Sequence, residues 1–419
     1  MAPPASAGVT ADAGRRAPPP VAGPACYVRP RADAPSSATI LAVSGIRRWW
    51  WVALFAAICA AAYAAQIHRE LADFEVYRTA GRRALAAEAL YREADGHYQF
   101  KYLPAFALAM TPIAALPPTV ARPVWFALSA TLLALFVRFS LAALPERRRP
   151  ASTVVLLTVV FMAKFYAHEL TLGQTNLLLG VMLVGSLRLL GRGSTAAAAA
   201  LAAAAVFVKP YALVLLPWLA WAGGATAAGT AGLVLAAGLA VPALVYGWSG
   251  NLELLHGWYA TVGGSTAGNL LGNDNVSLAG MWAKWIGPGP TASGLAAATA
   301  GALLLFALLA LLRGRSLRHG AFFDVALLLT IVPLLSPQGW DYVLLLATPA
   351  VMLIVDRWHE LGRGWRLLAA AGLAGVGLTI YDLLGRELYG AFMAASGVTV
   401  AVLTGVLPVL ARLRWMRLS

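Results

Sequence analysis

Long apolar runs alternate with short polar or basic joins from about residue 49 onward. Because lipid offers the backbone no hydrogen-bond partner, a run that crosses a bilayer must be helical and needs about 20 mostly apolar residues. The pattern predicts a first span at 49–65 and one net crossing within 104–144, where Pro112, Pro117 and Pro118 indicate a broken or re-entrant helix. Further spans are predicted at roughly 152–168, 174–191, 195–208, 211–222, 226–246, 295–312, 321–335, 340–356, 366–382 and 391–411. We therefore expect an all-α polytopic membrane protein with about twelve transmembrane helices.

The joins that carry arginine fall at alternate ends of these runs. Arginine-rich joins tend to stay on the cytoplasmic side of a membrane, and five groups can lie there together: Arg147, Arg148 and Arg149; Arg188 and Arg192; Arg313, Arg315 and Arg318; Arg357, Arg363 and Arg366; and Arg412, Arg414 and Arg417. Both termini are then cytoplasmic. Two long polar segments, 66–103 and 247–294, fall on the outer face, together with shorter joins around Gly173, Lys209 and Pro337.

Residues 1–45 differ from the rest, since they are rich in Ala, Pro and Ser and show no helical period. Such a segment cannot bury enough apolar surface to offset the entropy lost on ordering it. We expect a disordered cytoplasmic tail at 1–45, followed by a single transmembrane domain at 46–419.

Composition supports the membrane prediction and changes how the charge is interpreted. Hydrophobic residues make up 60% of the chain and charged residues 12%, with a mean hydropathy of +0.71, against roughly half and a quarter in soluble domains. The net charge of +14 would suggest nucleic acid in a soluble protein. Here the arginines lie between apolar runs, so membrane lipids are expected partners and nucleic acid is not. The sequence also lacks the phosphate-loop, CxxC, HExxH and GxSxG motifs of soluble enzymes.

The first outer segment places Asp73 close to the outer end of the first span. A carboxylate there is costly to desolvate, and partial burial raises its pKa toward that of a general base for an acceptor hydroxyl. The alternative is an N-cap for a helix over 74–89, an amphipathic stretch that would lie in the membrane interface. Further along, His97, Lys101 and Tyr102 suit a lipid phosphate or a sugar face, although tyrosine is common at interfaces.

Two of the shorter outer joins also carry polar side chains at membrane depth. The turn between two apolar runs near Gly173 holds His168, Glu169, Gln174 and Asn176. Amides at this depth bind either sugar hydroxyls or a neighbouring helix. Lys209, followed by the helix breaker Pro210, is either a phosphate ligand or a cation that snorkels to the interface.

Two polar clusters with adjacent tryptophan complete the candidate set. They are GNDNVSLAGMW at 272–282, which holds Asp274 and Asn275, and SPQGWDYV at 336–343, which holds Trp340 and Asp341. Tryptophan stacking with Asp and Asn on hydroxyls suits sugar binding, while Asn, Asp and Gly also simply form turns. Asp73, Asp274 and Asp341 could share a metal ion, but nothing in their spacing requires one, and we predict no metal site.

The order of these motifs resembles glycosyltransferase family 87. The resemblance rests on D-F-x-V-Y at 73–77, L-Y at 90–91, K-Y-L-P-A-F at 101–106, G-Q-T-N at 173–176, K-P at 209–210, N-x-S at 275–277 and S-P-Q-G-W-D at 336–341. Each motif is weak alone, but the whole series in this order, over most of the chain beyond residue 45, is specific. Leu103 departs from a common Tyr-Pro-Pro, and Tyr342 replaces a frequent histidine, which weakens a donor-phosphate role for that position.

The resemblance implies a GT-C membrane fold that takes a hexose, mannose before others, from a polyprenyl-phosphate donor. Transfer to a lipid or glycan acceptor would occur on the outer face, with inversion at the anomeric carbon and no cofactor beyond the donor substrate. Asp73 matches the family's catalytic aspartate. Together with their polar positions, this favours donor-phosphate or sugar contacts by Lys209, Lys101, Tyr102, Gln174, Asn176, Asn275, Trp340 and Asp341, and an acceptor side at Tyr77, Arg78 and His97.

A multi-span transporter, or a flippase of lipid-linked sugars, is the main alternative from another class. It would also show many spans and few polar residues at membrane depth, but transporters tend to have internal repeats and helices broken near the midplane. Here the polar motifs gather on one face and no repeat is visible, which favours the enzyme. A polysaccharide polymerase or ligase would share the outer-face site but not this order of motifs.

Overall fold

The computed structural model describes residues 51, 53–313 and 320–416. The chain divides into two units, residues 1–58 and residues 59–419, and all elements from η1 onward belong to the second unit. The tail predicted at 1–45 lies outside the described residues, as do Arg315, Arg318 and Arg417 of the basic joins. An apolar helix at Ala53–Ala65 covers part of the span predicted at 49–65.

Within the described ranges every regular element is helical, apart from one isolated antiparallel bridge between Asn275 and Trp340. The elements up to the middle of the chain are η1 (Ile67–Arg69), α2 (Ala72–Leu85), η2 (Glu93–Tyr98), α3 (Pro104–Ala109), α4 (Thr111–Ala114), α5 (Pro118–Ala143), α6 (Ala151–Leu172), α7 (Asn176–Gly191), α8 (Thr195–Val208), η3 (Pro210–Leu215) and α9 (Leu216–Ala240). The later elements are α10 (Ala243–Asn269), α11 (Leu278–Ile286), α12 (Pro290–Arg313), α13 (Gly320–Leu335), η4 (Asp341–Ala347), α14 (Thr348–Asp356), η5 (Trp358–Glu360), α15 (Arg363–Gly377), α16 (Tyr381–Ala394), α17 (Gly397–Ala401), η6 (Val402–Val406) and α18 (Leu407–Trp415).

Several of these helices are long and apolar enough to cross a membrane. In the part of the chain that the structure describes there are five: Pro118–Ala143, Ala151–Leu172, Pro210–Ala240, Pro290–Leu312 and Gly397–Trp415. The pair α15 and α16, bent by 91°, would form a sixth if it counts as one span, and α7, α8 and α13 are shorter apolar helices. The chain is thus an all-helical membrane protein, while the count of about twelve spans stays a prediction.

The segment at 104–144 is broken where its prolines predict a break. α3 and α4 are single short helices, Pro112 lies inside α4, and α5 begins at Pro118 directly after Pro117. Proline suits the first turn of a helix and interrupts a helix interior. The only helix of this segment with the length of a span is α5.

The helix break predicted between 211–222 and 226–246 is confirmed, and it lies at Gly224. η3 and the part of α9 before Gly224 form one helix and the rest of α9 forms a second, because Gly224, with φ +64° and ψ −154°, lies outside the helical region. A Cβ on Gly223 would lie 2.7 Å from Thr195 at the start of α8, and one on Gly238 would overlap the ring of Phe207 near the end of α8. The second helix therefore runs back along α8, and the glycine permits the positive φ at the break. α10 then begins at Ala243, which makes the outer segment predicted at 247–294 largely helical.

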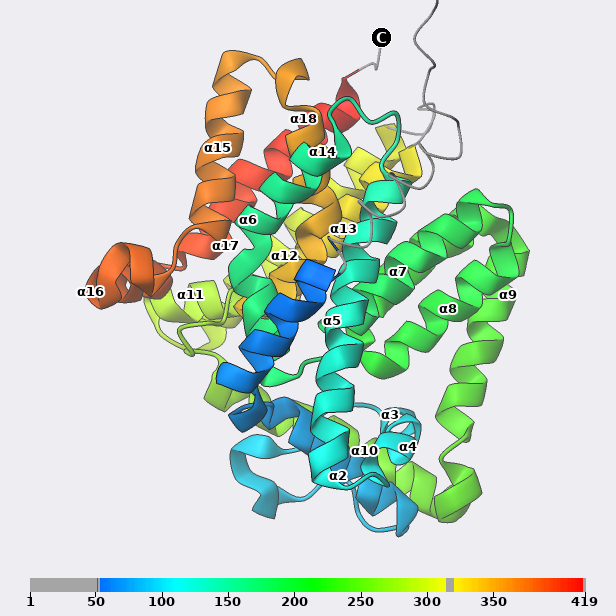
Figure 1. Cartoon of the computed structure of the whole chain (residues 1–419). Coiled ribbons are helices and arrows are strands. Elements are labelled where there is room, and N and C mark those ends of the chain that lie inside the picture. The colour runs from blue at the N-terminus through cyan, green and yellow to red at the C-terminus, as the bar shows by residue number, and fades with distance from the viewer. Residues whose placement is uncertain (1–50, 52, 314–319, 417–419) are drawn as a thin grey trace, which may run out of the picture. The chain divides into compact units, whose positions relative to one another are not determined.

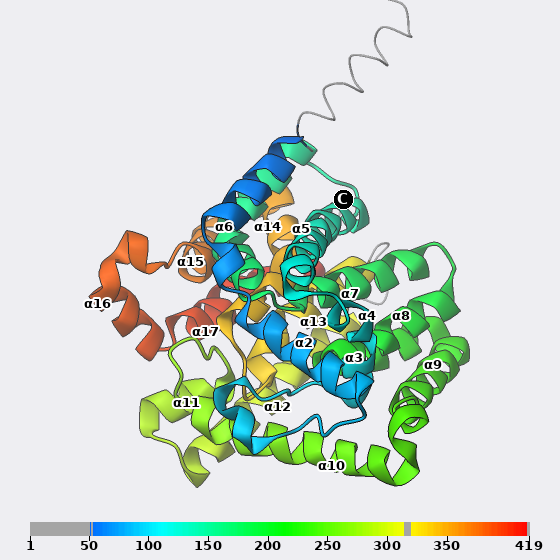
Figure 2. The ribbon, with the colours of Figure 1, turned by 60° about the horizontal axis from the view of Figure 1, so that its bottom comes forward.

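Four helices gather at one end of the long helices: α2, α3, α4 and α10 (Figure 1). α2 packs on α3 and α4, and α3 also contacts α8 and α10. Figure 2, turned toward this end, shows α2, α3 and α4 side by side with α10 running beside them. This end holds the polar motifs of residues 73–102.

Two basic joins meet at the opposite end of the long helices. The Asp356 carboxylate accepts hydrogen bonds from the backbone N–H groups of Arg148 and Arg149, each at 2.9 Å. The Arg357 guanidinium donates to the Pro145 carbonyl at 2.8 Å. The joins after α5 and after α14 therefore lie together, which agrees with their expected position on one side of the membrane.

The centre of the second unit is built from α13, η4 and α14, in which nearly every side chain is buried. These helices are shielded by the others, so their apolar residues pack on protein. The SPQGWD motif at 336–341 connects α13 to η4. A turn held between two buried helices presents its side chains in a fixed place.

Candidate functional site

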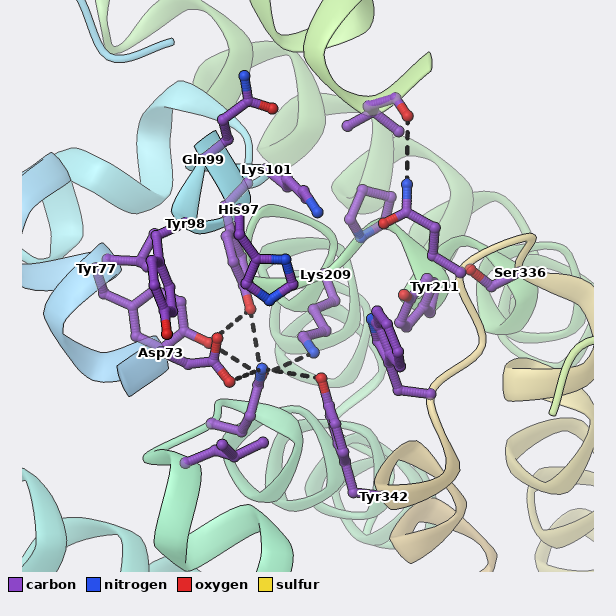
Figure 3. Close-up of a pocket in the computed structure, with 18 of the residues that line it drawn as sticks. Asp73, Tyr77, His97, Tyr98, Gln99, Lys101, Lys209, Tyr211, Ser336 and Tyr342 are labelled. Carbon is purple, nitrogen blue, oxygen red and sulfur yellow. Dashed lines mark hydrogen bonds between the residues drawn. The ribbon is translucent and has the colours of Figure 1, made fainter. Parts of the chain in front are cut away.

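A cavity of about 550 Å³ lies where the polar motifs meet, and we call it the Asp73 cavity. Its walls come from α2, the segment 97–102, the last turns of α6, the joins at 174 and 209–211, one face of α10, and residues 336–342. The volume falls in the usual range for small-molecule sites. Figure 3 shows its polar side chains pointing toward one another from these separate elements.

Asp73 projects into this cavity from the first turn of α2. The helix begins at Ala72, and its N-cap is Leu71 in the left-handed region at φ +63°, so Asp73 is not the N-cap and that alternative is wrong. The Asp73 carboxylate accepts a hydrogen bond of 2.7 Å from the Gln174 amide. Burial raises the pKa of Asp73 above its ordinary value, while this hydrogen bond and the nearby Lys209 and His168 oppose the rise.

Gln174 joins the groups of the cavity into one network. Its Nε2 donates to Asp73 at 2.7 Å and to the Tyr342 hydroxyl at 3.1 Å. Its Oε1 accepts from Tyr77 at 2.9 Å and from Lys209 at 3.1 Å. A carboxylate needs the amide N–H and an ammonium needs the amide oxygen, so the two charged partners fix the orientation of the amide. Figure 3 shows these hydrogen bonds converging at one point.

Lys209 lies at the junction between α8 and η3 and is surrounded by aromatic rings. The residue is 7% exposed, and its Nζ lies 5.8, 5.8 and 6.0 Å from the ring centroids of Tyr102, Tyr211 and Tyr342. Such rings stabilise a cation that has lost its water. One of the three ammonium N–H groups binds Gln174. The described residues leave the other two available to an anion in the cavity.

His168, in the last turns of α6, lines the cavity next to Tyr342. Its ring contacts the Tyr342 ring edge-on with 4.9 Å between centroids, and its Nδ1 lies 3.5 Å from Asp341 Oδ1, within ion-pair distance. Tyr342 accepts from Gln174, so its own O–H can donate to a ligand. Lys209, Tyr342 and His168 therefore form one wall rich in donors.

The two polar clusters at 272–282 and 336–343 are brought together by the bridge between Asn275 and Trp340. The backbone N–H of Asp341 donates to the Asp274 carbonyl at 2.8 Å. The Asn275 side chain donates to the Pro337 carbonyl at 2.9 Å and accepts from the N–H of Ser277 at 2.9 Å. Asn275 is 1% exposed, so its amide holds the two loops together.

Most of the predicted site residues line the Asp73 cavity: Asp73, Tyr77, His97, Lys101, Tyr102, Gln174, Lys209 and Trp340. They come from segments up to 267 residues apart (340 − 73). Burial lowers the pKa of Lys101, and the nearby Asp73 opposes this. The sequence identified these side chains but not their contacts.

Four predicted residues do not line this cavity, which corrects their placement. Arg78 pairs with Glu75 at 2.9 Å, away from the cavity. Asn176 is fully buried and donates to Glu169 at 2.7 Å, which is the helix-to-helix bonding expected as the alternative. Asn275 holds the loops, and Asp341 lies behind His168.

The predicted set of site residues left out several residues that line the cavity: Tyr98, Gln99, His168, Tyr211, Trp258, Val262, Thr266, Asp274, Gln338 and Tyr342. Of these, the sequence had drawn attention to His168, Asp274 and Tyr342. Trp258, Val262 and Thr266 are four residues apart, which places them on one face of α10. This spacing could have identified the three residues as one face of a helix from the sequence alone. Tyr211 directly follows the K-P motif, and Tyr342 directly follows W-D. Among the described residues, no group of three or more His, Cys, Asp or Glu side chains is placed to hold a metal ion.

The fold and the site define an integral membrane protein whose polar cavity combines a buried carboxylate with a caged ammonium at one end of the long helices. The model of glycosyltransferase family 87 matches residues 100–337, more than half of the chain. The chain belongs to glycosyltransferase family 87 and is a membrane glycosyltransferase. Comparison with curated proteins and with solved structures gave no match. The matched range contains Lys101, Gln174 and Lys209 and leaves out Asp73 and Tyr342.

Proposed function

We propose that this protein moves a hexose, mannose before others, from a polyprenyl-phosphate donor to a lipid or glycan acceptor, with inversion at the anomeric carbon. Its fold would be of the GT-C type, and Asp73 would be the general base. The observation that carries the proposal is the Gln174 amide, which binds Asp73 at one end and Lys209 at the other. Such a transfer needs a base and a ligand for the phosphate. Asp73 and Lys209 can supply these two groups, and the single side chain of Gln174 connects them.

The proposed reaction is a single in-line displacement. Asp73 takes the proton of an acceptor hydroxyl, and the acceptor oxygen forms a bond to C1 of the sugar. The bond between C1 and the phosphate oxygen breaks at the same time, and its electron pair leaves with the polyprenyl phosphate. Attack from the face opposite the leaving group inverts C1. A carboxylate whose pKa is raised by burial is a better base than an exposed one.

The leaving phosphate gains negative charge as the bond to C1 breaks, so cationic donors must face it. Lys209 has two N–H groups free for this among the described residues, and its tyrosine enclosure keeps water away from the charge. Tyr342 and His168 supply further donors on the same wall. Lys101 lines the cavity as a second ammonium.

Transfer on the outer face is supported by the position of the basic joins. The joins after α5 and after α14 lie together at the end opposite the Asp73 cavity. Arginine-bearing joins favour the cytoplasmic side. The cavity would then open to the outer side, where a flipped lipid-linked donor is available and nucleotide sugars are not.

Reconstituted protein and a labelled donor test this function. Purified full-length protein in liposomes is supplied with radiolabelled polyprenyl-phosphate mannose and a membrane lipid extract, with and without EDTA. We expect a new α-mannosylated product in both conditions. Absence of product with polyprenyl-phosphate mannose, and with the glucose and galactose donors, would contradict the proposal.

The Lys209→Met variant adds a measurement of donor binding. We expect a raised KM for the donor and a lower rate, because the leaving phosphate loses its ammonium partner. His256→Gln, an exposed residue of α10 outside the cavity, serves as the control and should behave as the wild type. For the wild type, movement of unreacted donor across the bilayer without any mannosylated product would favour the alternative function, a flippase of lipid-linked sugars.

A further inference from the structure

A second cavity of about 330 Å³ adjoins the Asp73 cavity, and we call it the Glu75 cavity. The two cavities share Ala72, Val76 and Tyr98 in their linings. Ala72 precedes Asp73 directly, and Val76 follows it by about one turn. Asp73 therefore stands at the border between the two cavities.

α2 presents a different stripe of side chains to each cavity. The Glu75 cavity receives residues 72, 75, 76, 79 and 83, whose spacing of three, four, seven and eleven residues is one face of a helix. The remaining walls are Asp95, Tyr98 and Phe100 from the segment that follows α2. Residues 73 and 77 point into the Asp73 cavity instead.

The charged groups of the Glu75 cavity are held in fixed positions by ion pairs. Arg83 binds Asp95 through two hydrogen bonds, at 2.5 and 2.7 Å, and this pairing lowers the pKa of Asp95. Burial would raise the pKa of Glu75, but hydrogen bonds from Arg122 and Arg78 bring it below its ordinary value. Both carboxylates are thus ionised acceptors at neutral pH.

The remaining lining groups are a hydroxyl and two aromatic rings. Thr79 is an exposed residue within the stripe, between Val76 and Arg83. Phe100 is 1% exposed and forms an apolar wall, while Tyr98 is 56% exposed and stands between the two cavities. Fixed carboxylates, a guanidinium, a hydroxyl and aromatic faces are groups that bind a ring with both C–H faces and hydroxyls.

We propose that the Glu75 cavity is the acceptor subsite and that it binds a terminal, uncharged hexose of the acceptor. This inference rests on the proposed function and deepens it, because it names the chemical class of the acceptor as a glycosylated molecule. A hexose in this cavity reaches across Ala72 and Val76 to present one hydroxyl to Asp73. The donor phosphate then lies on the far side, at Lys209.

The charge of the cavity argues against two other occupants. A phosphate-bearing headgroup finds no free cation among the described residues of this cavity, because Arg83 is paired with Asp95, and Arg78 and Arg122 are paired with Glu75. The ion pairs would be left without water beside an acyl chain, at a cost in free energy. A neutral sugar meets neither penalty.

Sugar binding can be measured without turnover, on the full-length chain in lipid nanodiscs with methyl α-D-mannopyranoside as the probe. Saturation-transfer NMR detects weak binding of such a single sugar. We expect a signal with the wild type and with Asp73→Asn, and its loss with Thr79→Trp, whose indole fills the Glu75 cavity. Arg82→Trp, also exposed on α2 but outside both cavities, should keep the signal.

The outcomes separate this inference from the proposed function. A signal in Thr79→Trp equal to that of the wild type, or no signal in the wild type, overturns the acceptor subsite. Thr79→Leu is a smaller replacement at the same position. The thermal unfolding midpoint of each variant shows whether it is folded. If the wild type fails to use any polyprenyl-phosphate donor while the pattern of signals holds, the subsite stands and the proposed function fails. Transfer to octyl α-D-mannopyranoside or to soluble mannobiose then distinguishes a lipid-borne from a glycan-borne sugar.

Discussion

Gln174 is the side chain through which the charged groups of the site act on one another. It lies 101 residues from Asp73 and 35 from Lys209, and the three segments meet at one amide. Both ends of the amide are occupied, so the carboxylate and the ammonium are oriented before any substrate binds. This arrangement costs no reorganisation when charge develops in the reaction.

Gln174→Leu tests this role, because leucine has a similar shape and no polar atoms. We expect the transfer rate to fall by about 100-fold, as Asp73 and Lys209 lose their shared partner and shift. Initial rates in liposomes at saturating donor measure the effect. Gln66→Leu, an exposed residue outside the cavity, is the matched control, and equal rates for both variants would contradict the assignment.

The pH dependence of the rate reports on Asp73. Burial raises the pKa of this carboxyl above its ordinary value, and the group acts as a base only when it is ionised. The rate should therefore fall as the pH is lowered through a pKa above that of an ordinary aspartate, and be constant above it on this limb. Rates at saturating donor across the acid range test this, and a limb at the ordinary value of about 3.9 or lower would speak against a buried base.

Residue types were predictable here and their partners were not. A carboxylate or lysine at membrane depth stands out in an apolar sequence, which is how Asp73 and Lys209 were found. Asn275 and Asn176 stand out equally, yet they hold loops and helices. Sequence alone cannot separate these cases, because the difference lies in partners from distant segments.

At the scale of elements, one turn sets the position of Gln174. Gly173 ends α6 in the left-handed region at φ +69°, and its carbonyl accepts a hydrogen bond from Trp125 at 2.8 Å. A Cβ at this position would lie 2.9 Å from Cβ of Phe74 and 3.0 Å from Leu71. The turn, the start of α2 and α5 are therefore packed around a glycine.

Gly173→Ala should destabilise the protein by more than the backbone cost alone. Left-handed backbone costs a non-glycine residue roughly 1–2 kcal/mol, and the contact with α2 adds to it. Gly193→Ala is the matched control, since Gly193 has φ +80° and nothing within 4 Å of the added carbon. Thermal unfolding should show a larger loss for Gly173→Ala, together with a lower transfer rate. Equal losses would mean that the close packing at Gly173 has no effect.

Element boundaries were predictable where prolines or charges mark them. The breaks at Pro112 and Pro118 are examples. Gly224 also marks a break, and it lies between the segments predicted at 211–222 and 226–246. The length of α2 was overestimated, since it covers Ala72–Leu85 and not 74–89.

At the scale of the whole molecule, the proposal requires the Asp73 cavity and the basic joins to face opposite sides of the membrane. Single cysteines at Glu88 and at Arg192, in a chain whose Cys26 and Cys59 are replaced, test this in intact cells. A membrane-impermeant maleimide should label the cysteine at 88 and not the one at 192. The reverse pattern would place the cavity on the cytoplasmic side.

Removal of the acceptor proton by Asp73 is the central step of the proposed reaction. The most direct test compares Asp73→Asn with Glu88→Gln, an exposed carboxylate of the same outer segment, in liposomes with labelled polyprenyl-phosphate mannose. We predict that Asp73→Asn abolishes transfer while donor binding persists, and that Glu88→Gln transfers at the rate of the wild type. Transfer by Asp73→Asn at a near-normal rate would contradict it.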